Sequence, residues 1–218
     1  VTRVFGANFI GRMSGKVVEA FVAKADLLAA SPAYSDQSGV DWKTAAASAA
    51  KVLNHIGGVD GMDPTGWTWY CNGDDIEKLS PTESPAEILW RGERAKSLSL
   101  EEDNFPPTLY GNGRINPTQN LVDAFPMLNG YPVSHLSGEY DENLPYANRD
   151  PRLEAYILYN GCKAGNTNKE IFTAADGTTN DALNKVVGRS TRTGYYLRKL
   201  LRQDISLDPN AKADQYHY

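Results

Sequence analysis

Two alanine-rich segments with helical periodicity occupy the first sixty residues, and they constrain the fold more than any other feature. Apolar residues recur at helical spacing from Gly11 to Ala30. Ser31-Pro32 ends this helix, because the residue before a proline is pushed out of the α region. A second helix starts after Asp41, which suits the N-cap, and Gly57-Gly58 ends it. The sequence therefore predicts an αα-hairpin.

Small side chains predict which sides of the two helices face each other. Ala20 and Ala23 of the first helix and Ala46 and Ala49 of the second would allow close approach, with Trp42 filling the remaining space. The hairpin is tetratricopeptide-like, with a period of about 34 residues. Because one such pair cannot bury its apolar face, we expect it to need partners from elsewhere.

Beyond residue 58 the periodicity is lost, and Gly and Pro interrupt the chain at short intervals. Short strands are expected at 86–91, 155–160 and 194–198, and short helices at 74–79 and 118–125. The predicted fold class is mostly α: a tetratricopeptide-like helical hairpin plus a long loop-rich region with short strands and helices.

Length and composition set broad limits. We expect one domain over 1–218, with the hairpin at 1–58 and an irregular subregion at 59–218. The net charge of −5 argues against nucleic-acid binding, because there is no basic excess to neutralise phosphates.

No apolar stretch approaches the roughly 20 residues of a membrane span, and no signal peptide is evident. Cys71 and Cys162 could form one bridge or remain separate thiols.

Motifs for catalysis or cofactor binding are weak. Gly111–Asn116 lacks the third glycine of a dinucleotide fingerprint and is interpreted as a turn. Asp60–Asp63 lacks the ligand order of a calcium loop, and the three histidines are scattered. The acidic run Glu101–Asp103 is typical of a solvated face. We expect no cofactor, no metal site and no enzyme activity.

An aromatic cluster is the best candidate for ligand binding. If the segment were extended, Trp67 and Trp69 would project to one face and form a platform for the flat, apolar faces of sugars. Asn72, Asp74 and Asp75 follow closely and could bind sugar hydroxyls. The alternative is that both rings pack against the helical hairpin, since large rings are mostly buried.

Several strings together resemble the SusD/RagB family of outer-membrane lipoproteins from Bacteroidetes. They follow the family's order and include Ala25–Tyr34, Trp42–Leu53, Glu87–Trp90, Asn104–Pro107, Asn116–Phe125, Tyr146–Arg152, Tyr156–Gly161 and Thr193–Lys199. The resemblance covers nearly the whole chain. Family members are longer, so the chain is expected to be a central to C-terminal fragment.

Two of these strings suggest structural roles. The guanidinium groups of Arg149 and Arg152 each offer several hydrogen-bond donors, and the Asp150 carboxylate offers an acceptor. Such side chains are suited to holding loops together. Pro117 suits a first helical turn, with Asn116 as its cap. The family resemblance therefore does not locate a ligand.

The resemblance implies capture of glycans at the outer cell surface, without catalysis. The partners expected are an oligosaccharide or polysaccharide and a SusC-like TonB-dependent transporter, with a lipid anchor outside this segment. Trp67, Trp69 and Trp90 are the predicted stacking residues, and Asn72 and Asp74 the predicted polar contacts. The alternatives are a protein-interaction module that uses the hairpin and a carbohydrate-active hydrolase.

Overall fold

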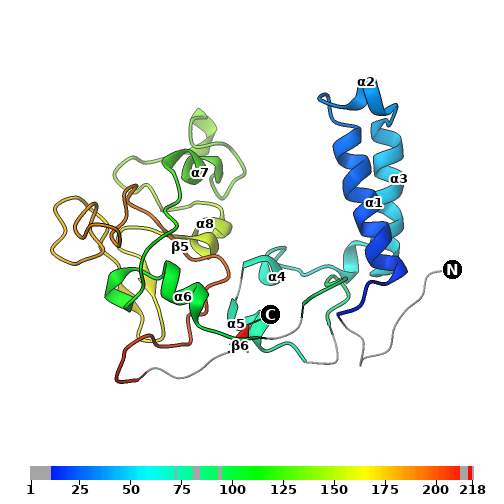
Figure 1. Ribbon diagram of the computed structural model, residues 1–218. Coiled ribbons are helices and arrows are strands. Elements are labelled where there is room, and N and C mark those ends of the chain that lie inside the picture. The colour runs from blue at the N-terminus through cyan, green and yellow to red at the C-terminus, as the bar shows by residue number, and fades with distance from the viewer. Residues whose placement is uncertain (1–10, 72, 81–83, 93–94, 212–215, 218) are drawn as a thin grey trace. The chain divides into compact units, whose positions relative to one another are not determined.

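A computed structural model describes residues 11–71, 73–80, 84–92, 95–211 and 216–217 (Figure 1). The chain divides into two compact units. Of the described residues, the first unit comprises 11–66, 78–80 and 84–92, and the second comprises 67–71, 73–77, 95–211 and 216–217. The expectation of a single domain over 1–218 stays a prediction.

The first unit contains the predicted αα-hairpin. Helix α1 (Gly15–Ala29) packs against α3 (Trp42–His55), and the short α2 (Ser35–Ser38) lies between them in the chain (Figure 1). The Asp41 carboxylate accepts a hydrogen bond from the Thr44 backbone N–H at 2.7 Å and begins α3. Capping of this kind contributes about 1 kcal/mol. The hairpin and its Asp41 cap are confirmed.

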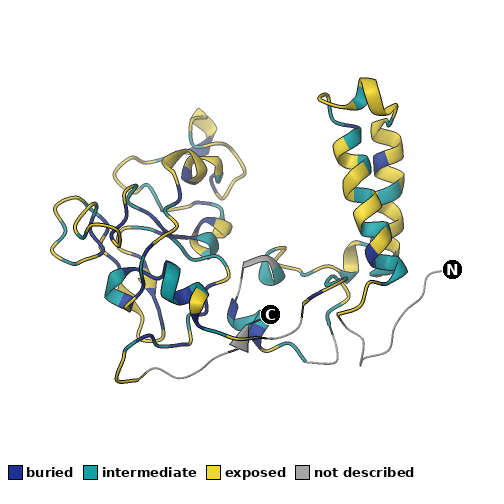
Figure 2. Ribbon diagram, viewed as in Figure 1, coloured by how far each residue is buried: buried dark blue, intermediate teal, exposed yellow. Residues whose placement is uncertain are grey.

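The stripe of α3 that faces α1 differs from the predicted one. Ala45 is buried, whereas Ala46 and Ala49 are exposed. Trp42 is 56% exposed, so its role as the large group that fills the interface is wrong. Figure 2 shows that most of the hairpin surface is exposed. Because alanine occurs on nearly every side of α3, apolar spacing alone could not identify the facing stripe.

Polar pairs across the hairpin explain this rotation of α3. The Ser48 hydroxyl donates to the Asp26 carboxylate at 2.5 Å, and the His55 Nε2 lies 2.5 Å from the Glu19 carboxylate. Residues 48 and 55 are two turns apart, and they share a stripe with Ala45. These pairs thus turn Ala45 inward.

The predicted strand at 86–91 is wrong. The Ile88 backbone N–H donates to the Pro85 carbonyl at 3.0 Å and closes a turn. The Glu87 carboxylate accepts a hydrogen bond from the Asp63 backbone N–H at 2.5 Å. Local turn geometry and this long-range contact therefore replace the strand that the apolar residues suggested.

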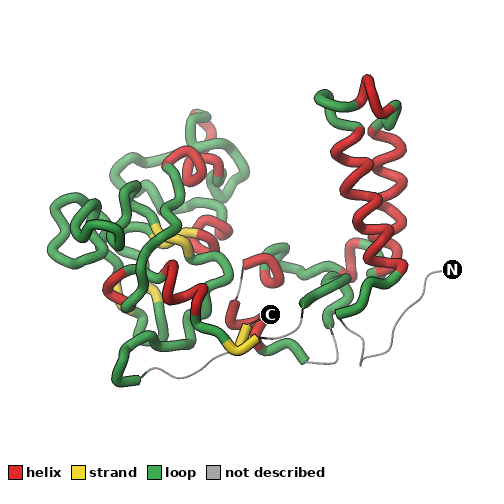
Figure 3. The backbone as a smooth tube through the Cα atoms, in the orientation of Figure 1, coloured by secondary structure: helices red, strands yellow, loops and turns green. Residues whose placement is uncertain are grey.

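Short elements joined by loops make up the second unit (Figure 3). Its helices are α4 (Thr68–Cys71), α5 (Gly73–Glu77), α6 (Ser99–Asn104), η3 (Pro107–Leu109), α7 (Gln119–Ala124), η4 (Leu136–Gly138) and α8 (Pro151–Tyr156), while η2 (Val59–Gly61) belongs to the first unit. The strands are β1 (Ala95–Lys96), β2 (Ile157–Leu158), β3 (Lys163–Ala164), β4 (Lys169–Glu170), β5 (Tyr196–Leu197) and β6 (Tyr216–His217). They pair antiparallel as β1 with β6, β2 with β5 and β3 with β4. The predicted fold class is confirmed.

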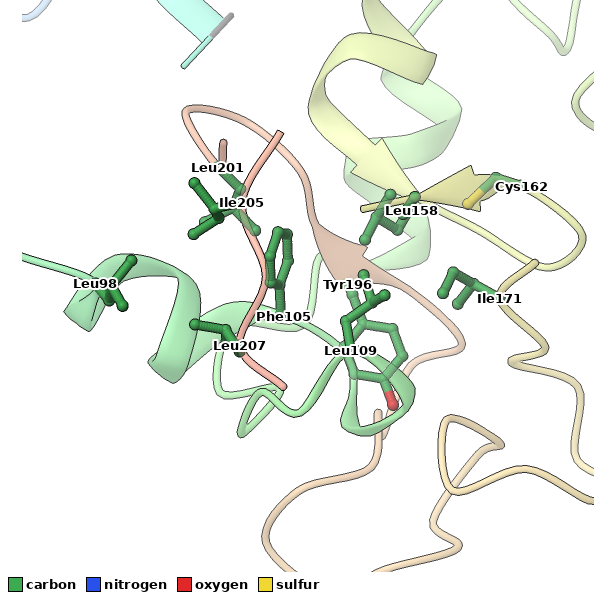
Figure 4. Packing of buried hydrophobic residues seen from close by; sticks show 11 residues of the cluster. Leu98, Phe105, Leu109, Leu158, Cys162, Ile171, Tyr196, Leu201, Ile205 and Leu207 are labelled. Atoms are coloured by element: carbon green, nitrogen blue, oxygen red, sulfur yellow. The ribbon is translucent and has the colours of Figure 1, made fainter. Parts of the chain in front are cut away.

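The core of the second unit forms around the β2–β5 pair. Leu158 lies opposite Tyr196, and both are fully buried. The predicted strands at 155–160 and 194–198 contain this pair, although residues 155 and 156 belong to α8. Cys162 is a free thiol in the core, where burial raises its pKa to about 11. Figure 4 shows the surrounding side chains: Leu98, Phe105, Leu109, Leu158, Cys162, Ile171, Tyr196, Leu201, Ile205 and Leu207.

Helix α7 begins at a different cap from the predicted one. The Thr118 hydroxyl accepts a hydrogen bond from the Leu121 backbone N–H at 3.3 Å and caps the helix. Asn116 instead donates to the Gly113 carbonyl at 2.9 Å and accepts from the Arg192 backbone N–H at 3.1 Å. The predicted cap at Asn116 is therefore wrong, because this amide bridges two loops.

Candidate functional site

A cleft of about 410 Å³ lies within the second unit. Its lining comes from the start of the α4–α5 region, from α8 and from the chain after β5: Trp67, Asp74, Pro151, Glu154, Ala155, Arg198, Leu201 and Gln203. Such a volume lies within the roughly 300–1,000 Å³ of small-molecule sites. Two residues selected from the sequence, Trp67 and Asp74, thus line one hollow.

Helix α8 supplies one side of the cleft. Pro151, Glu154 and Ala155 have the spacing that places them on one helical face. Asp150 caps the helix by accepting a hydrogen bond from the Arg152 backbone N–H at 2.9 Å. The Glu154 side chain is exposed and makes no hydrogen bond or salt bridge within the described part of the chain. Its carboxylate is therefore available to accept hydrogen bonds from a ligand.

The segment after β5 supplies the facing side. The Arg198 backbone N–H donates to the Tyr156 carbonyl at 2.9 Å, which attaches this segment to the end of α8. One guanidinium nitrogen of Arg198 donates to the Lys163 carbonyl at 3.3 Å, and its other N–H groups make no hydrogen bond to the residues that the structure describes. Leu200 has a φ of +66°, a conformation that costs a leucine about 1–3 kcal/mol. A Cβ at Gly73 would lie 2.5 Å from the Leu200 carbonyl oxygen, so glycine permits this approach.

Buried charges hold the strained segment in place. Arg202 is 6% exposed, and its guanidinium contacts Glu77 at 3.5 Å and Asp204 at 2.7 Å. Its backbone N–H donates to the Glu101 carboxylate at 3.0 Å. The segment is therefore fixed to α5 and α6, and this side of the cleft is preorganised.

Asp74 shapes the cleft through the backbone. Its carboxylate accepts hydrogen bonds from the Gln203 N–H at 2.8 Å and the Asp204 N–H at 3.3 Å. Burial and the neighbouring Asp204 carboxylate raise the pKa of Asp74 above its ordinary value. Burial opposes ionisation of Asp204 too, but hydrogen bonds from Arg202 and Asp74 lower its pKa. The pKa values of the two carboxylates are therefore shifted in opposite directions.

The Asp74→Asn substitution is expected to leave the free energy of unfolding at about pH 8 unchanged or to raise it by up to about 1 kcal/mol. The amide oxygen can still accept both N–H groups, and the desolvated charge is removed. Because the pKa of Asp74 is raised, its contribution to stability is present at low pH and is lost as the pH rises through that pKa. The difference in the free energy of unfolding between the variant and the natural protein should therefore shrink as the pH falls and disappear below about pH 4.

Urea unfolding across this pH range measures the effect, with Asp74→Ala as the comparison. Alanine leaves two backbone N–H groups without an acceptor and should lower the free energy of unfolding by about 1–3 kcal/mol. If the asparagine and alanine variants lost equal stability, the acceptor role assigned to Asp74 would be wrong.

The other predicted contact residues are placed differently. The extended geometry suggested for Trp67 and Trp69 is wrong, because Thr68–Cys71 is a helical turn and residues two apart on a helix do not face the same way. Trp69 is half-buried and does not line the cleft. Trp90 belongs to the first unit, where its indole N–H donates to a backbone carbonyl at 3.0 Å. Asn72 lies outside the described residues.

Sequence reasoning missed Glu154, Arg198 and Gln203. Their positions follow from α8 and from the segment after β5, neither of which carries a binding motif. Pro151 is the one sequence signal that could have indicated Glu154. Proline favours the first turn of a helix, and a helix that starts at Pro151 places Glu154 on the same face.

Within the described residues, no three His, Cys, Asp or Glu side chains are grouped so that they could hold a metal ion. Over the same part of the chain, no helix combines the length and apolar content required to cross a bilayer.

Two solved structures share this fold, a helical hairpin followed by a loop-rich unit. A SusD-like carbohydrate-binding protein from Bacteroides fragilis is 19% identical with a TM-score of 0.63, and the match covers 96% of this chain and 38% of that one. A SusD-like protein from the same species is 22% identical with a TM-score of 0.65, covering 98% and 41%. The chain thus spans about two fifths of the length of these structures.

The family is also recognised directly from the sequence. The model of the SusD family matches residues 89–217, which is more than half of the chain. The chain therefore belongs to the SusD family. The comparison with curated proteins gave no match.

Proposed function

We propose that the chain is part of a cell-surface protein that binds glycans without cleaving them, and that the cleft beside Trp67 holds the ligand. The cleft itself carries the proposal: a half-buried indole and a set of hydrogen-bonding groups line one hollow of ligand size. Membership of the SusD family supports it, as does the carbohydrate-binding description of one solved relative.

The lining chemistry suits a sugar. An indole face offers a flat apolar surface for the C–H face of a pyranose ring, as aromatic rings do at wet interfaces. The Glu154 carboxylate accepts hydrogen bonds from hydroxyls, and the Arg198 guanidinium donates them. Pro151 and Ala155 add apolar surface between these groups. Affinity then comes from stacking and hydrogen bonding, with no bond broken.

In the whole protein we place this binding at the outer membrane, in an outward-facing lipoprotein. The bound oligosaccharide would be delivered to a SusC-like TonB-dependent transporter, and the lipid anchor would lie outside this segment. Trp69, Trp90 and Asn72 remain proposed glycan contacts, with Trp90 on the first unit and not assigned to the cleft.

Replacement of Trp67 by alanine is expected to weaken oligosaccharide binding at least about tenfold, since it removes the stacking surface. A glycan array identifies a ligand, and titration calorimetry then measures its affinity. Trp42→Ala is the matched control, because Trp42 is an exposed tryptophan of the hairpin and should change affinity less than about twofold.

Unchanged affinity in Trp67→Ala would show that the ligand binds elsewhere. Trp69→Ala and Trp90→Ala, measured with the same ligand, then test the remaining stacking residues. Release of shorter products during incubation would contradict a binding role without catalysis.

A second candidate function rests on the hairpin surface. Large apolar side chains of α1 and α3 are exposed, among them Val18 (51%), Phe21 (51%), Leu27 (58%) and Leu28 (59%). Such a surface favours contact with a protein. Capture of a protein that survives excess glycan, together with a silent glycan array, would favour this function.

A further inference from the structure

A second hollow, here called the cup, lies in the same unit and has a volume of about 150 Å³. It shares no lining residue with the cleft. One hydrogen bond connects the two linings, because the Gly165 backbone N–H of the cup donates to the Gln203 side chain of the cleft at 3.0 Å. The volume equals that of about five water molecules, which is room for one sugar ring and not for two.

The floor of the cup is the hydrophobic core itself. Phe105, Leu109, Ile205 and Leu207 line it and are at most 8% exposed (Figure 4). These side chains also pack against one another in the core. A ligand therefore meets a rigid apolar surface.

An aromatic ring is held at the edge of the cup. Tyr110 is 47% exposed and has a φ of +66°, in a region that favours glycine. Its backbone N–H donates to the Pro107 carbonyl at 2.9 Å, and its hydroxyl lies 3.4 Å from the Asp208 carboxylate. A tyrosine that keeps a strained conformation while its ring stays exposed is typical of a contact residue.

Polar groups complete the lining without net charge. The side chains of Asn166 and Thr167 lie in the β3–β4 turn, are exposed, and make no hydrogen bond within the described part of the chain. Lys169 brings one positive charge, with its ammonium 5.9 Å from the Tyr110 ring centroid, and Asp208 brings one negative charge. The two charges balance, which favours a neutral ligand over an anionic one.

We propose that the cup binds one neutral sugar ring, with its apolar face on Tyr110 and its hydroxyls on the β3–β4 turn. It is a second glycan subsite, separate from the cleft, and this inference rests on the proposed glycan-binding function.

Saturation-transfer NMR with methyl glycosides of neutral hexoses tests this subsite. Tyr110→Gly is the variant of choice, because glycine accepts the positive φ and the fold is retained while the ring is lost. We expect transfer to at least one methyl glycoside, about tenfold weaker binding in Tyr110→Gly, and binding retained in Tyr110→Phe. Tyr131→Ala is the matched control, since Tyr131 is 45% exposed and lies outside the cup.

The outcomes separate the two proposals. If methyl glycosides do not bind, or bind equally well to Tyr110→Gly, the cup is not a subsite, whether or not oligosaccharides bind the cleft. If transfer is lost in Trp67→Ala and kept in Tyr110→Gly, the single ring binds the cleft and the cup is again excluded. A silent glycan array together with silent methyl glycosides would overturn both proposals.

Discussion

The Arg149→Met substitution is expected to lower the free energy of unfolding by about 3–5 kcal/mol. Arg149 is 7% exposed, and its guanidinium donates to the carbonyls of Pro145 at 2.9 Å, Val122 at 2.6 Å and Phe125 at 2.8 Å. Methionine fills similar space but donates nothing. Three carbonyls then lose their donor, at about 1–3 kcal/mol for each that stays buried. Urea unfolding of the variant measures the loss.

Arg152→Met in the same Asn-Arg-Asp-Pro-Arg string is the matched control. The Arg152 side chain is 50% exposed and pairs with Asp150, whose side chain is 13% exposed. Because solvent around the exposed Arg152 guanidinium screens the pair, this variant should lose no more than about 1 kcal/mol. Equal losses at the two positions would show that Arg149 does not pin the loops, contrary to the role assigned to it.

Features set by neighbours in the sequence could be predicted. The hairpin, the Asp41 cap and the short α7 helix depend on periodicity and on capping within a few residues. The pinning role of Arg149 also followed from residue chemistry, since a guanidinium with five donors suits several carbonyls. The strings shared with the SusD/RagB family predicted the overall fold, because together, and in the family's order, they are specific to that family.

Features set by distant contacts could not be predicted. The facing stripe of α3 depends on Ser48 and His55 meeting carboxylates of α1, and apolar spacing does not contain that information. The cleft combines residue 67 with residues 151 to 155 and 198 to 203, and only the folded chain brings these together. Asp74 was predicted as a sugar contact, yet its carboxylate is engaged by two backbone N–H groups.

The Thr191→Val substitution is expected to cost about 2–4 kcal/mol, since it removes a hydroxyl at the centre of a buried network. The Thr191 hydroxyl is fully buried and donates to the Tyr195 carbonyl at 2.7 Å. It also accepts from the backbone N–H groups of Thr193, Gly194 and Tyr195, each at 3.1 Å. Thr193 and Gly194 are half-buried, so water can replace part of the loss there.

The Thr191→Ser substitution distinguishes the contribution of the hydroxyl network from that of side-chain packing. Serine keeps the hydroxyl and loses one methyl group, which should lower the free energy of unfolding by about 1 kcal/mol. The network precedes β5, and the chain after β5 carries Arg198 and Gln203 into the cleft. The valine variant should therefore also lose oligosaccharide affinity under conditions in which it remains folded, whereas the serine variant should keep it. Equal unfolding free energies for the two variants would mean that the Thr191 hydroxyl does not organise this turn.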